Sequence, residues 1–368
     1  MSKLTTLASL MFLSALTGCT GEGLIDQYLE NYDFKQQVWT KVDVGVAADL
    51  SAMQWQDAST GYIVGDQGTV LKTADGGGTW KASNPAAMAG ERLLSVSFVS
   101  PTLGFVASKG AVYATQDGGA TWTKKPAFPK AVGEEILRAR FITAGAGYVA
   151  GSKKAYQTLD GGETWTPLAL INVRDFDATA NLVYAGGGNI YRAMVGTGWD
   201  GLLSADQACS ECSSWINFIT AADGWAVITG RGTLTGSQAF AVLRTKDGGG
   251  SWTNLPTQNH EGKPLGPYLR GASFDTLRAL RFTDAQNGWM IFGGGLLNTY
   301  DGGQTWVPQQ QDFVLGSNQF FNKYVMENLH TFGLQDLQAV DGKNAWVVGD
   351  KGGVYKFTGA MHPIHHEK

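Results

Sequence analysis

The chain has 368 residues, of which 28 are Lys or Arg and 32 are Asp or Glu, giving a net charge of −4. So few cations exclude non-specific nucleic-acid binding, which depends on basic side chains that displace counterions. The 50 glycines follow no three-residue period and accompany 12 tryptophans, which excludes a collagen-like or disordered chain, because so many aromatic side chains require a packed core.

The first 18 residues have the features of an export signal. A lysine gives a short positive region, and residues 4–16 form an apolar stretch too short to span a bilayer. Small residues precede Cys19, as in a bacterial lipoprotein signal, in which the cysteine becomes the acylated N-terminus. An ordinary signal peptide that happens to contain a cysteine is the alternative. We expect residues 1–18 to be removed and residues 19–35 to form a tether.

More than one acyl chain on Cys19 would give stable membrane anchoring. Thr20 follows the cysteine, where an aspartate would favour retention at the inner membrane. We therefore expect an exported lipoprotein on the periplasmic face of the outer membrane, or on the lumenal side of the thylakoid in a photosynthetic organism.

Beyond the tether, a pattern of the form S/T-x-D-x-G-x-T/S-W recurs five times. Its aspartates are 42, 43, 87 and 54 residues apart, so a degenerate copy falls within the interval of 87, at residues 191–199. The aspartate and tryptophan positions are Asp75 and Trp80, Asp117 and Trp122, Asp160 and Trp165, Asp247 and Trp252, and Asp301 and Trp306.

A second feature recurs upstream of each copy: an aromatic residue ends an apolar stretch, and a glycine followed by another aromatic comes six residues later. The pairs are Trp55 and Gly61, Phe98 and Gly104, Phe141 and Gly147, Phe218 and Gly224, and Phe282 and Gly288. Residues 173–184 and 336–348 resemble this feature less closely. Together these segments define seven units.

Each unit is predicted to contain four short strands, and such a unit cannot bury both of its faces alone. Radial stacking of the units gives an all-β fold, a seven-bladed β-propeller with Asp-containing hairpins, over residues 36–359. The last unit stops after Phe357 without a fourth strand, whereas residues 37–42 resemble the strand that follows a repeat, as at 122–125. We expect this N-terminal strand to close the ring.

The recurring pattern is the Asp box, or bacterial neuraminidase repeat. Tandem copies joined by strands such as residues 61–73 resemble the photosystem II stability/assembly factor family. The resemblance implies a seven-bladed propeller, exported or lipid-anchored, with an arginine-rich recognition surface and a role in assembling photosystem II where one is present. Asp boxes also occur in sialidases, xyloglucanases and sortilin-type receptors.

The five Asp-box aspartates are predicted to be structural, since five equivalent positions cannot all be catalytic. The carboxylate of an Asx turn accepts hydrogen bonds from its own backbone, glycines supply positive φ, and the tryptophan fills the space between blades.

Cys209 and Cys212 remain after lipidation of Cys19. In an exported protein this pair indicates a small-loop disulfide. A redox-active C-x-x-C motif is the alternative, although it normally begins a helix in a βαβ unit. Zinc would need a second pair of ligands, which the sequence lacks nearby.

Four extensions are predicted to fall on one face of the propeller, at the loops that enter the blades and the turns between second and third strands. They are the Cys209–Cys212 loop and residues 230–238, 256–275 and 309–335. Long loops on one face of a repeat scaffold usually form the binding face. Neutral drift in tolerant loops is the alternative.

Unusual charges occur on the predicted innermost strands. Arg140 and Arg281 occupy the same position in two units, each directly before the strand-ending phenylalanine. The candidate binding residues are Arg92, Arg138, Arg140, Arg278 and Arg281. These arginines either pair internally, with Glu134, Glu135 or Asp336, or recognise a carboxylate, which the guanidinium geometry favours.

We expect no enzymatic activity, cofactor or metal. The Phe/Tyr-Arg-Ile-Pro segment of sialidases is absent, and no EF-hand spacing is present. The histidines near the C-terminus lie in residues 360–368, which we expect to be a flexible tail.

These observations predict a monomeric, non-catalytic, lipid-anchored propeller that binds a membrane protein complex or the precursor of one of its subunits and acts in its assembly. A cell-surface carbohydrate-binding protein and a sialidase-like glycoside hydrolase are the alternatives. Aromatic side chains gathered on the loop face, at Trp215, Tyr268, Phe320 and Phe321, would favour sugar binding.

Overall fold

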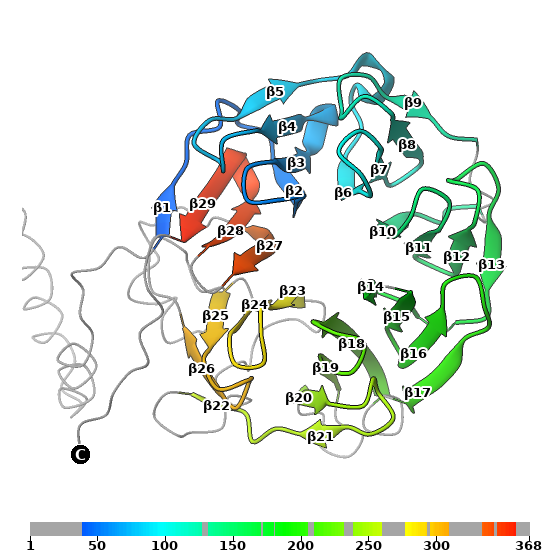
Figure 1. The fold of residues 1–368 in the computed structure, drawn as a ribbon, viewed down its shortest axis with the longest axis vertical. Helices are drawn as coiled ribbons and strands as arrows, with labels where there is room; N and C mark the ends of the chain where they lie inside the picture. The colour runs from blue at the N-terminus through cyan, green and yellow to red at the C-terminus, as the bar shows by residue number, and fades with distance from the viewer. Residues whose placement is uncertain are drawn as a thin grey trace, which may run out of the picture. The chain divides into compact units, whose positions relative to one another are not determined.

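A computed structural model describes residues 39–126, 132–170, 172–179, 181–204, 210–231, 238–259, 277–292, 295–308, 333–341 and 344–357. These residues form seven sheets, each built around antiparallel strands and arranged as the blades of a propeller (Figure 1). Within these ranges no helix is long and apolar enough to cross a bilayer. The all-β, seven-bladed propeller predicted from the repeats is confirmed.

In each of the first four blades, the strands follow one another in sequence order from the channel outward. Blade 1 contains β2 (Leu50–Trp55), β3 (Gly61–Gly65), β4 (Val70–Thr73) and β5 (Lys81–Ser83). Blade 2 contains β6 (Leu93–Phe98), β7 (Gly104–Ser108), β8 (Val112–Thr115) and β9 (Thr123–Lys124). Blade 3 contains β10 (Ile136–Phe141), β11 (Gly147–Gly151), β12 (Ala155–Thr158) and β13 (Thr166–Leu168). Blade 4 contains β14 (Asp175–Thr179), β15 (Leu182–Gly186), β16 (Asn189–Met194) and β17 (Asp200–Ser204).

The last three blades follow the same order. Blade 5 contains β18 (Ser210–Phe218), β19 (Gly224–Arg231), β20 (Gln238–Thr245) and β21 (Thr253–Asn254). Blade 6 contains β23 (Leu277–Phe282), β24 (Gly288–Phe292), β25 (Gly295–Thr299) and β26 (Thr305–Pro308), and β22 (Gln258–Asn259) pairs in parallel with its outer strand. Blade 7 contains β27 (Leu334–Asp341), β28 (Asn344–Gly349), β29 (Gly353–Phe357) and β1 (Trp39–Lys41).

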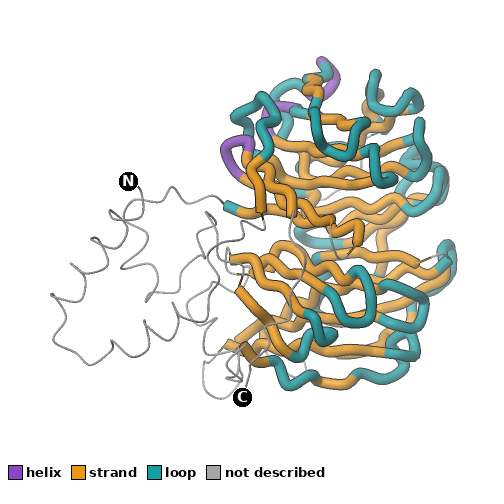
Figure 2. Tube along the Cα trace, turned by 60° about the vertical axis from the view of Figure 1, so that its left-hand side comes forward, coloured by secondary structure: helices purple, strands orange, loops and turns teal. Residues whose placement is uncertain are grey.

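The innermost strands touch one another in ring order. β2 contacts β6, and contacts continue through β10, β14, β18 and β23 to β27, which contacts β2 again. Figure 2 shows the strands as the body of the propeller, with loops at its rims. We call the rim with the turns between second and third strands the loop face, and the rim with the Asp-box hairpins the Asp-box face.

The ring is closed by the N-terminal strand. β1 pairs antiparallel with β29, and Trp39 lies opposite Phe357. Trp39 is buried, and its ring centroid lies 5.3 Å from that of Phe357. The fourth strand of blade 7 therefore comes from the other end of the propeller sequence, as its missing repeat predicted.

The recurring aromatic and glycine positions lie opposite each other in neighbouring strands. Phe141 pairs with Gly147, and a Cβ added at Gly147 would stand 2.5 Å from the Phe141 ring. The absence of a side chain lets the ring lie over the glycine and stack on the aromatic side chain of the preceding blade, Phe105 in this case, with centroids 3.6 Å apart. This packing explains the fixed spacing of six residues.

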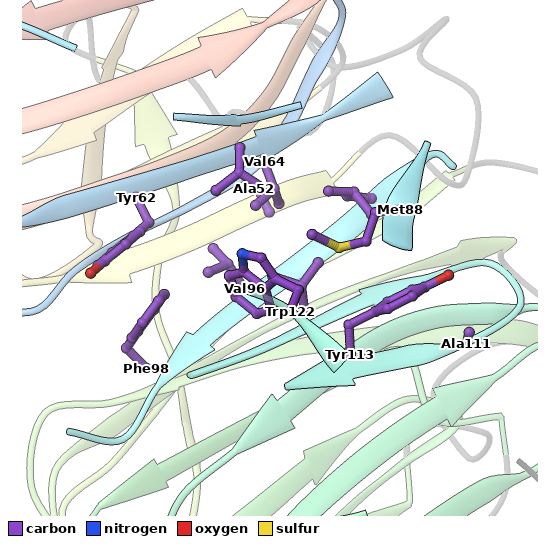
Figure 3. Close-up of a cluster of buried hydrophobic side chains, with 12 residues drawn as sticks. Ala52, Tyr62, Val64, Met88, Val96, Phe98, Ala111, Tyr113 and Trp122 are labelled. Carbon is purple, nitrogen blue, oxygen red and sulfur yellow. The ribbon is translucent and has the colours of Figure 1, made fainter. Parts of the chain in front are cut away.

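Each Asp-box tryptophan completes such a cluster between blades. In the cluster between blades 1 and 2, Tyr62 stacks on Phe98 with centroids 3.8 Å apart, and Trp122 meets Phe98 edge-on at 6.1 Å (Figure 3). Met88, in the short helical turn η2 (Ala86–Met88), fills the same cluster. The propeller core is thus a series of apolar seams between blades.

Blades 4 and 7 depart from this arrangement. In blade 4 the aromatic residue Phe176 pairs with Ala185 rather than with a glycine, and it lies tilted against Tyr148 at 5.5 Å. In blade 7 the corresponding pair is Ala339 and Ala345. Because no aromatic ring stacks over the second strand of either blade as in the other blades, that strand does not require a glycine. This explains why these two units are degenerate in sequence.

Candidate functional site

The Asp-box carboxylates bind their own hairpins. In blade 2, Oδ1 of Asp117 accepts hydrogen bonds from the Thr115 hydroxyl and the Thr121 backbone N–H, and Oδ2 accepts the Thr121 hydroxyl at 2.6 Å. Gly118 and Gly119 adopt φ of 68° and 91°, which side chains disfavour. The same bonds from the first Thr hydroxyl and from the backbone four residues on recur at Asp75, Asp160, Asp247 and Asp301.

These bonds stabilise the ionised carboxylate. Hydrogen bonds from Thr121 and Thr115 lower the pKa of Asp117 to about 2, and equivalent donors lower those of Asp160 and Asp247 to about 2. The pKa of Asp75 is lowered for the same reason. A carboxyl group held ionised in this way is a poor general acid.

The Asp-box hairpins also join the blades. The Gly118 carbonyl accepts hydrogen bonds from the Tyr62 hydroxyl and from Nζ of Lys72, both at 3.0 Å and both from the preceding blade. Arg192 bonds the Gly248 carbonyl of blade 5 in the same way, at 2.8 Å. The hairpins therefore hold the ring together on the Asp-box face.

The channel carries a set of polar side chains at one position of the innermost strands, opposite the aromatic residue of the second strand. In blades 1 to 7 this position is Gln54, Ser97, Arg140, Asp177, Asn217, Arg281 and Gln338. Several of these side chains accept the backbone N–H that ends the inner strand of the next blade. Asp177 accepts that of Phe218 at 2.7 Å, and Asn217 accepts that of Phe282 at 2.7 Å.

Arg138 spans the channel. Its Nη1 donates to Oδ1 of Asp175 in blade 4 at 3.1 Å, and its Nη2 donates to the Arg278 carbonyl in blade 6 at 3.4 Å. Burial alone would lower the pKa of Arg138, but the charges of Asp175 and Asp336 outweigh burial and raise it. The structure therefore brings β10 and β23, the two arginine-bearing strands, into one cluster.

The other two channel arginines face carboxylates in the next blade. Nη2 of Arg140 lies 3.6 Å from Oδ1 of Asp177, and Nη2 of Arg281 lies 3.9 Å from Oδ1 of Asp336. The other oxygen of Asp336 accepts the backbone N–H of Met53 in blade 1, at 3.0 Å. Burial raises the pKa of Asp177, while Arg140 and the Phe218 N–H lower it.

Arg278 and Arg92 differ from these three. Arg278 is exposed at the start of β23, and within the described parts of the chain its guanidinium has no carboxylate partner. Arg92 lies before β6 and pairs with Asp66 at 3.4 Å, so its ion pair belongs to the junction of blades 1 and 2 rather than to the cluster. We define the arginine cluster as Arg138, Arg140, Arg278 and Arg281.

The internal partners of these arginines were only partly named from the sequence. Of the three acids considered, Asp336 faces Arg281, whereas Glu135 pairs with Lys109. Buried Glu134 accepts the backbone N–H groups of Lys153 and Lys154 and so fixes the turn after β11. Asp175 and Asp177 were missed because they lie in the degenerate blade 4, where the shifted aromatic obscures the alignment of the strand. The one sequence signal for these acids was a pair of aspartates two residues apart on a predicted inner strand.

Several predicted features lie outside the described residues. These are Cys19 with residues 1–35, Cys209, most of the extensions at 230–238, 256–275 and 309–335, and residues 360–368. Cys212 falls within strand β18 rather than in a loop before it. Trp215 is buried in the core between blades 5 and 6, so it is not part of an exposed aromatic surface for sugars. No group of three metal-ligating side chains occurs among the described residues.

Comparison with known proteins supports the resemblance drawn from the Asp boxes. Residues 32–169 match the family model of the photosynthesis system II assembly factor YCF48, which confirms that resemblance. No curated protein sequence matches the chain.

Solved structures share the propeller fold at low sequence identity. YCF48 bound to a D1 peptide is 20% identical with a TM-score of 0.62, over 89% of this chain and 98% of that one. YCF48 from Cyanidioschyzon merolae is 19% identical with a TM-score of 0.60, over 87% and 98%. A GH74 xyloglucanase from Xanthomonas campestris is 15% identical with a TM-score of 0.51, over 86% of this chain and 60% of that one.

Proposed function

We propose that this chain, with its YCF48-like Asp-box propeller, is a non-catalytic assembly factor that binds a subunit, or subunit precursor, of a membrane protein complex. The match to the YCF48 family model and the similarity to a YCF48 structure that holds a D1 peptide support this proposal. In a photosynthetic organism the complex is photosystem II; elsewhere it is another complex of the cell envelope.

The observation that carries the proposal is the arginine cluster in the channel. Three of its four guanidinium groups face carboxylates, those of Asp175, Asp177 and Asp336. Among the described residues this leaves one positive charge in excess, and the exposed Arg278 stands at the loop-face end of its strand. Arg138 lies nearer the loop-face end of its strand, as Arg278 does, whereas Arg140 and Arg281 lie one residue before the Asp-box end of theirs. Guanidinium groups lining a rigid channel suit bidentate recognition of carboxylates, so an acidic segment of the partner is the expected ligand.

Lipid anchoring is the second part of the proposal. Acylated Cys19 would hold the protein on the bilayer, and residues 19–35 would tether the propeller as a monomer within reach of membrane partners. The site of action is then the periplasmic face of the outer membrane, or the thylakoid lumen. Metabolic labelling with an alkyne fatty acid tests this part, since labelling should be lost in Cys19→Ala.

The alternative is a carbohydrate-binding protein or glycoside hydrolase, which the GH74 likeness favours only at the level of the fold. The described channel carboxylates each face an arginine or a backbone N–H. A glycosidase instead needs one carboxyl group kept protonated as the acid beside an ionised partner. A glycan array and a hydrolase screen distinguish the two functions.

The direct test is a crosslinked pull-down from the protein's own membranes, with bound proteins identified by mass spectrometry. Wild type is compared with Arg278→Ala and with Arg140→Ala/Arg281→Ala. Arg92→Ala is the matched control, because this arginine pairs with Asp66 outside the cluster. Membrane subunits retained by wild type and Arg92→Ala but lost from the cluster variants support the proposal. An empty wild-type pull-down contradicts it.

A further inference from the structure

Asp177 is a channel carboxylate held by groups from both neighbouring blades. It is buried on β14, between Arg140 on the inner strand of blade 3 and Asn217 and Phe218 on that of blade 5. The charged and titratable groups around it are Arg140 on β10, Arg281 on β23, Asp175 on its own strand and Tyr184 on β15.

The two oxygens of Asp177 have different partners. Oδ2 accepts the Phe218 backbone N–H at 2.7 Å and the Asn217 side-chain amide at 3.3 Å. Oδ1 lies 3.6 Å from Nη2 of Arg140, beyond ordinary hydrogen-bond length. Asp177 is therefore fixed to blade 5 through Oδ2, and its charge is balanced through Oδ1.

This arrangement limits how the site responds to an acidic ligand. The Arg140 side chain is 39% exposed, whereas that of Asp177 is 10% exposed. A ligand carboxylate can therefore reach Arg140, while Asp177 cannot turn toward solvent without losing two hydrogen bonds. A buried carboxylate whose counter-ion is shared with a second anion becomes costly to keep ionised. Taking up a proton on Oδ1 removes this cost and leaves the bonds to Oδ2 in place.

We propose that the arginine cluster binds an acidic peptide together with one proton, which Asp177 takes up on Oδ1 as the peptide carboxylate engages Arg140. This inference rests on the proposed function and adds its pH control. The proton comes from solvent and forms an O–H bond on Oδ1, the oxygen that faces Arg140. Burial already raises the pKa of Asp177 in the free protein, which places the group closer to protonation.

Thermodynamic linkage between proton uptake and peptide binding fixes the direction of the pH effect on affinity. Uptake of one proton on binding makes the affinity rise as pH falls, by up to about tenfold per pH unit. The probe is a fluorescein-labelled hexaglutamate peptide, whose side chains stay ionised between pH 6 and 8 because their ordinary pKa is about 4.3.

The experiment measures the Kd of this peptide by fluorescence anisotropy at pH 6, 7 and 8, for wild type, Asp177→Asn and Asp66→Asn. Asp177→Asn keeps an acceptor for the Phe218 N–H and mimics the protonated state. It should bind more tightly than wild type at pH 8 and lose most of the pH dependence. Asp66→Asn, in the ion pair with Arg92, should retain the wild-type dependence. The five histidines titrate in the same pH range, so the inference is tested by the difference in pH dependence of Kd between the variants, not by the wild-type dependence alone.

Calorimetry of the wild type in two buffers of different ionisation enthalpy counts the protons directly and needs no variant. A count near one supports the inference, and a count near zero overturns it. Equal pH slopes for wild type and Asp177→Asn also overturn it, while leaving peptide binding intact. Absence of binding at every pH overturns the proposed function itself and this inference with it.

Discussion

The ring of Phe218 lies directly over Gly224, and a Cβ added to this glycine would stand 2.3 Å from Cδ1 of the phenylalanine. The two residues face each other across β18 and β19, six positions apart in sequence. The ring also stacks on Tyr184 of blade 4, with centroids 3.5 Å apart. The glycine is thus a requirement of the seam between blades.

Substituting Gly224→Ala is therefore expected to lower the free energy of unfolding by about 1–3 kcal/mol, because the methyl group displaces the ring from its stacked position. Chemical denaturation measures this loss. Gly201→Ala, on outer strand β17, is the control: a Cβ added there has no neighbouring atom within 4 Å, so stability should change by less than about 0.5 kcal/mol. Equal effects of the two substitutions would contradict the packing account.

The N-terminal strand is expected to stabilise the whole ring. Trp39→Ala removes a buried ring that packs against Phe357, which in turn meets Trp289 edge-on, and it should cost about 3–5 kcal/mol. Urea denaturation measures this cost, and limited proteolysis should show faster cleavage near the N-terminus. Lys41→Ala, an exposed position of the same strand, is the control. Unchanged proteolysis of Trp39→Ala would argue against closure by β1.

Asp-box stability should depend on pH with a defined sign. The folded pKa of Asp117, about 2, lies below its ordinary value of 3.8, so its ionised form stabilises the fold above that value and this stabilisation is lost as pH falls toward 2. Asp117→Ala should lower the Tm at pH 6 by several degrees and have a much smaller effect near pH 2. A Tm difference that does not depend on pH would exclude the carboxylate as the cause.

Internal pairing predicts different stability effects within the arginine cluster. Arg281→Ala leaves the buried carboxylate of Asp336 without its nearest described cation and should cost about 1–3 kcal/mol. Arg278→Ala, at an exposed position, should cost less than about 0.5 kcal/mol. Denaturant titration of the two variants compares them. A larger loss for Arg278→Ala would mean that the pairing is assigned wrongly.

Much of the fold could be predicted because the repeat encodes local requirements. The Asp-box turn needs a carboxylate that accepts hydrogen bonds, glycines that adopt positive φ, and a tryptophan. The Phe218 ring needs a residue without a Cβ beneath it, which is Gly224. Each requirement leaves a fixed residue type at a fixed spacing. Where the requirement disappears, as at Ala339 and Ala345, the pattern also disappears, although the blade still forms through pairing with its neighbours.

The site was less predictable because its contacts join residues far apart in sequence. Arg138 and Arg278 are 140 positions apart, yet they meet across the channel. The bond from Met53 to Asp336 spans 283 positions. Strand register identified which side chains reach the channel, but the pairing of arginines with aspartates depends on the closed ring.

The central claim, that a membrane partner binds at the loop face beside the exposed Arg278, is tested most directly by site-specific photocrosslinking. A benzophenone amino acid is placed at Lys154, in the exposed turn after β11 on the loop face, or at Leu159, 55% exposed in the Asp-box hairpin of the same blade. Crosslinking in native membranes should give an adduct with a membrane subunit from position 154 and none from position 159. Adducts from position 159 alone would contradict the claim and place the partner on the Asp-box face.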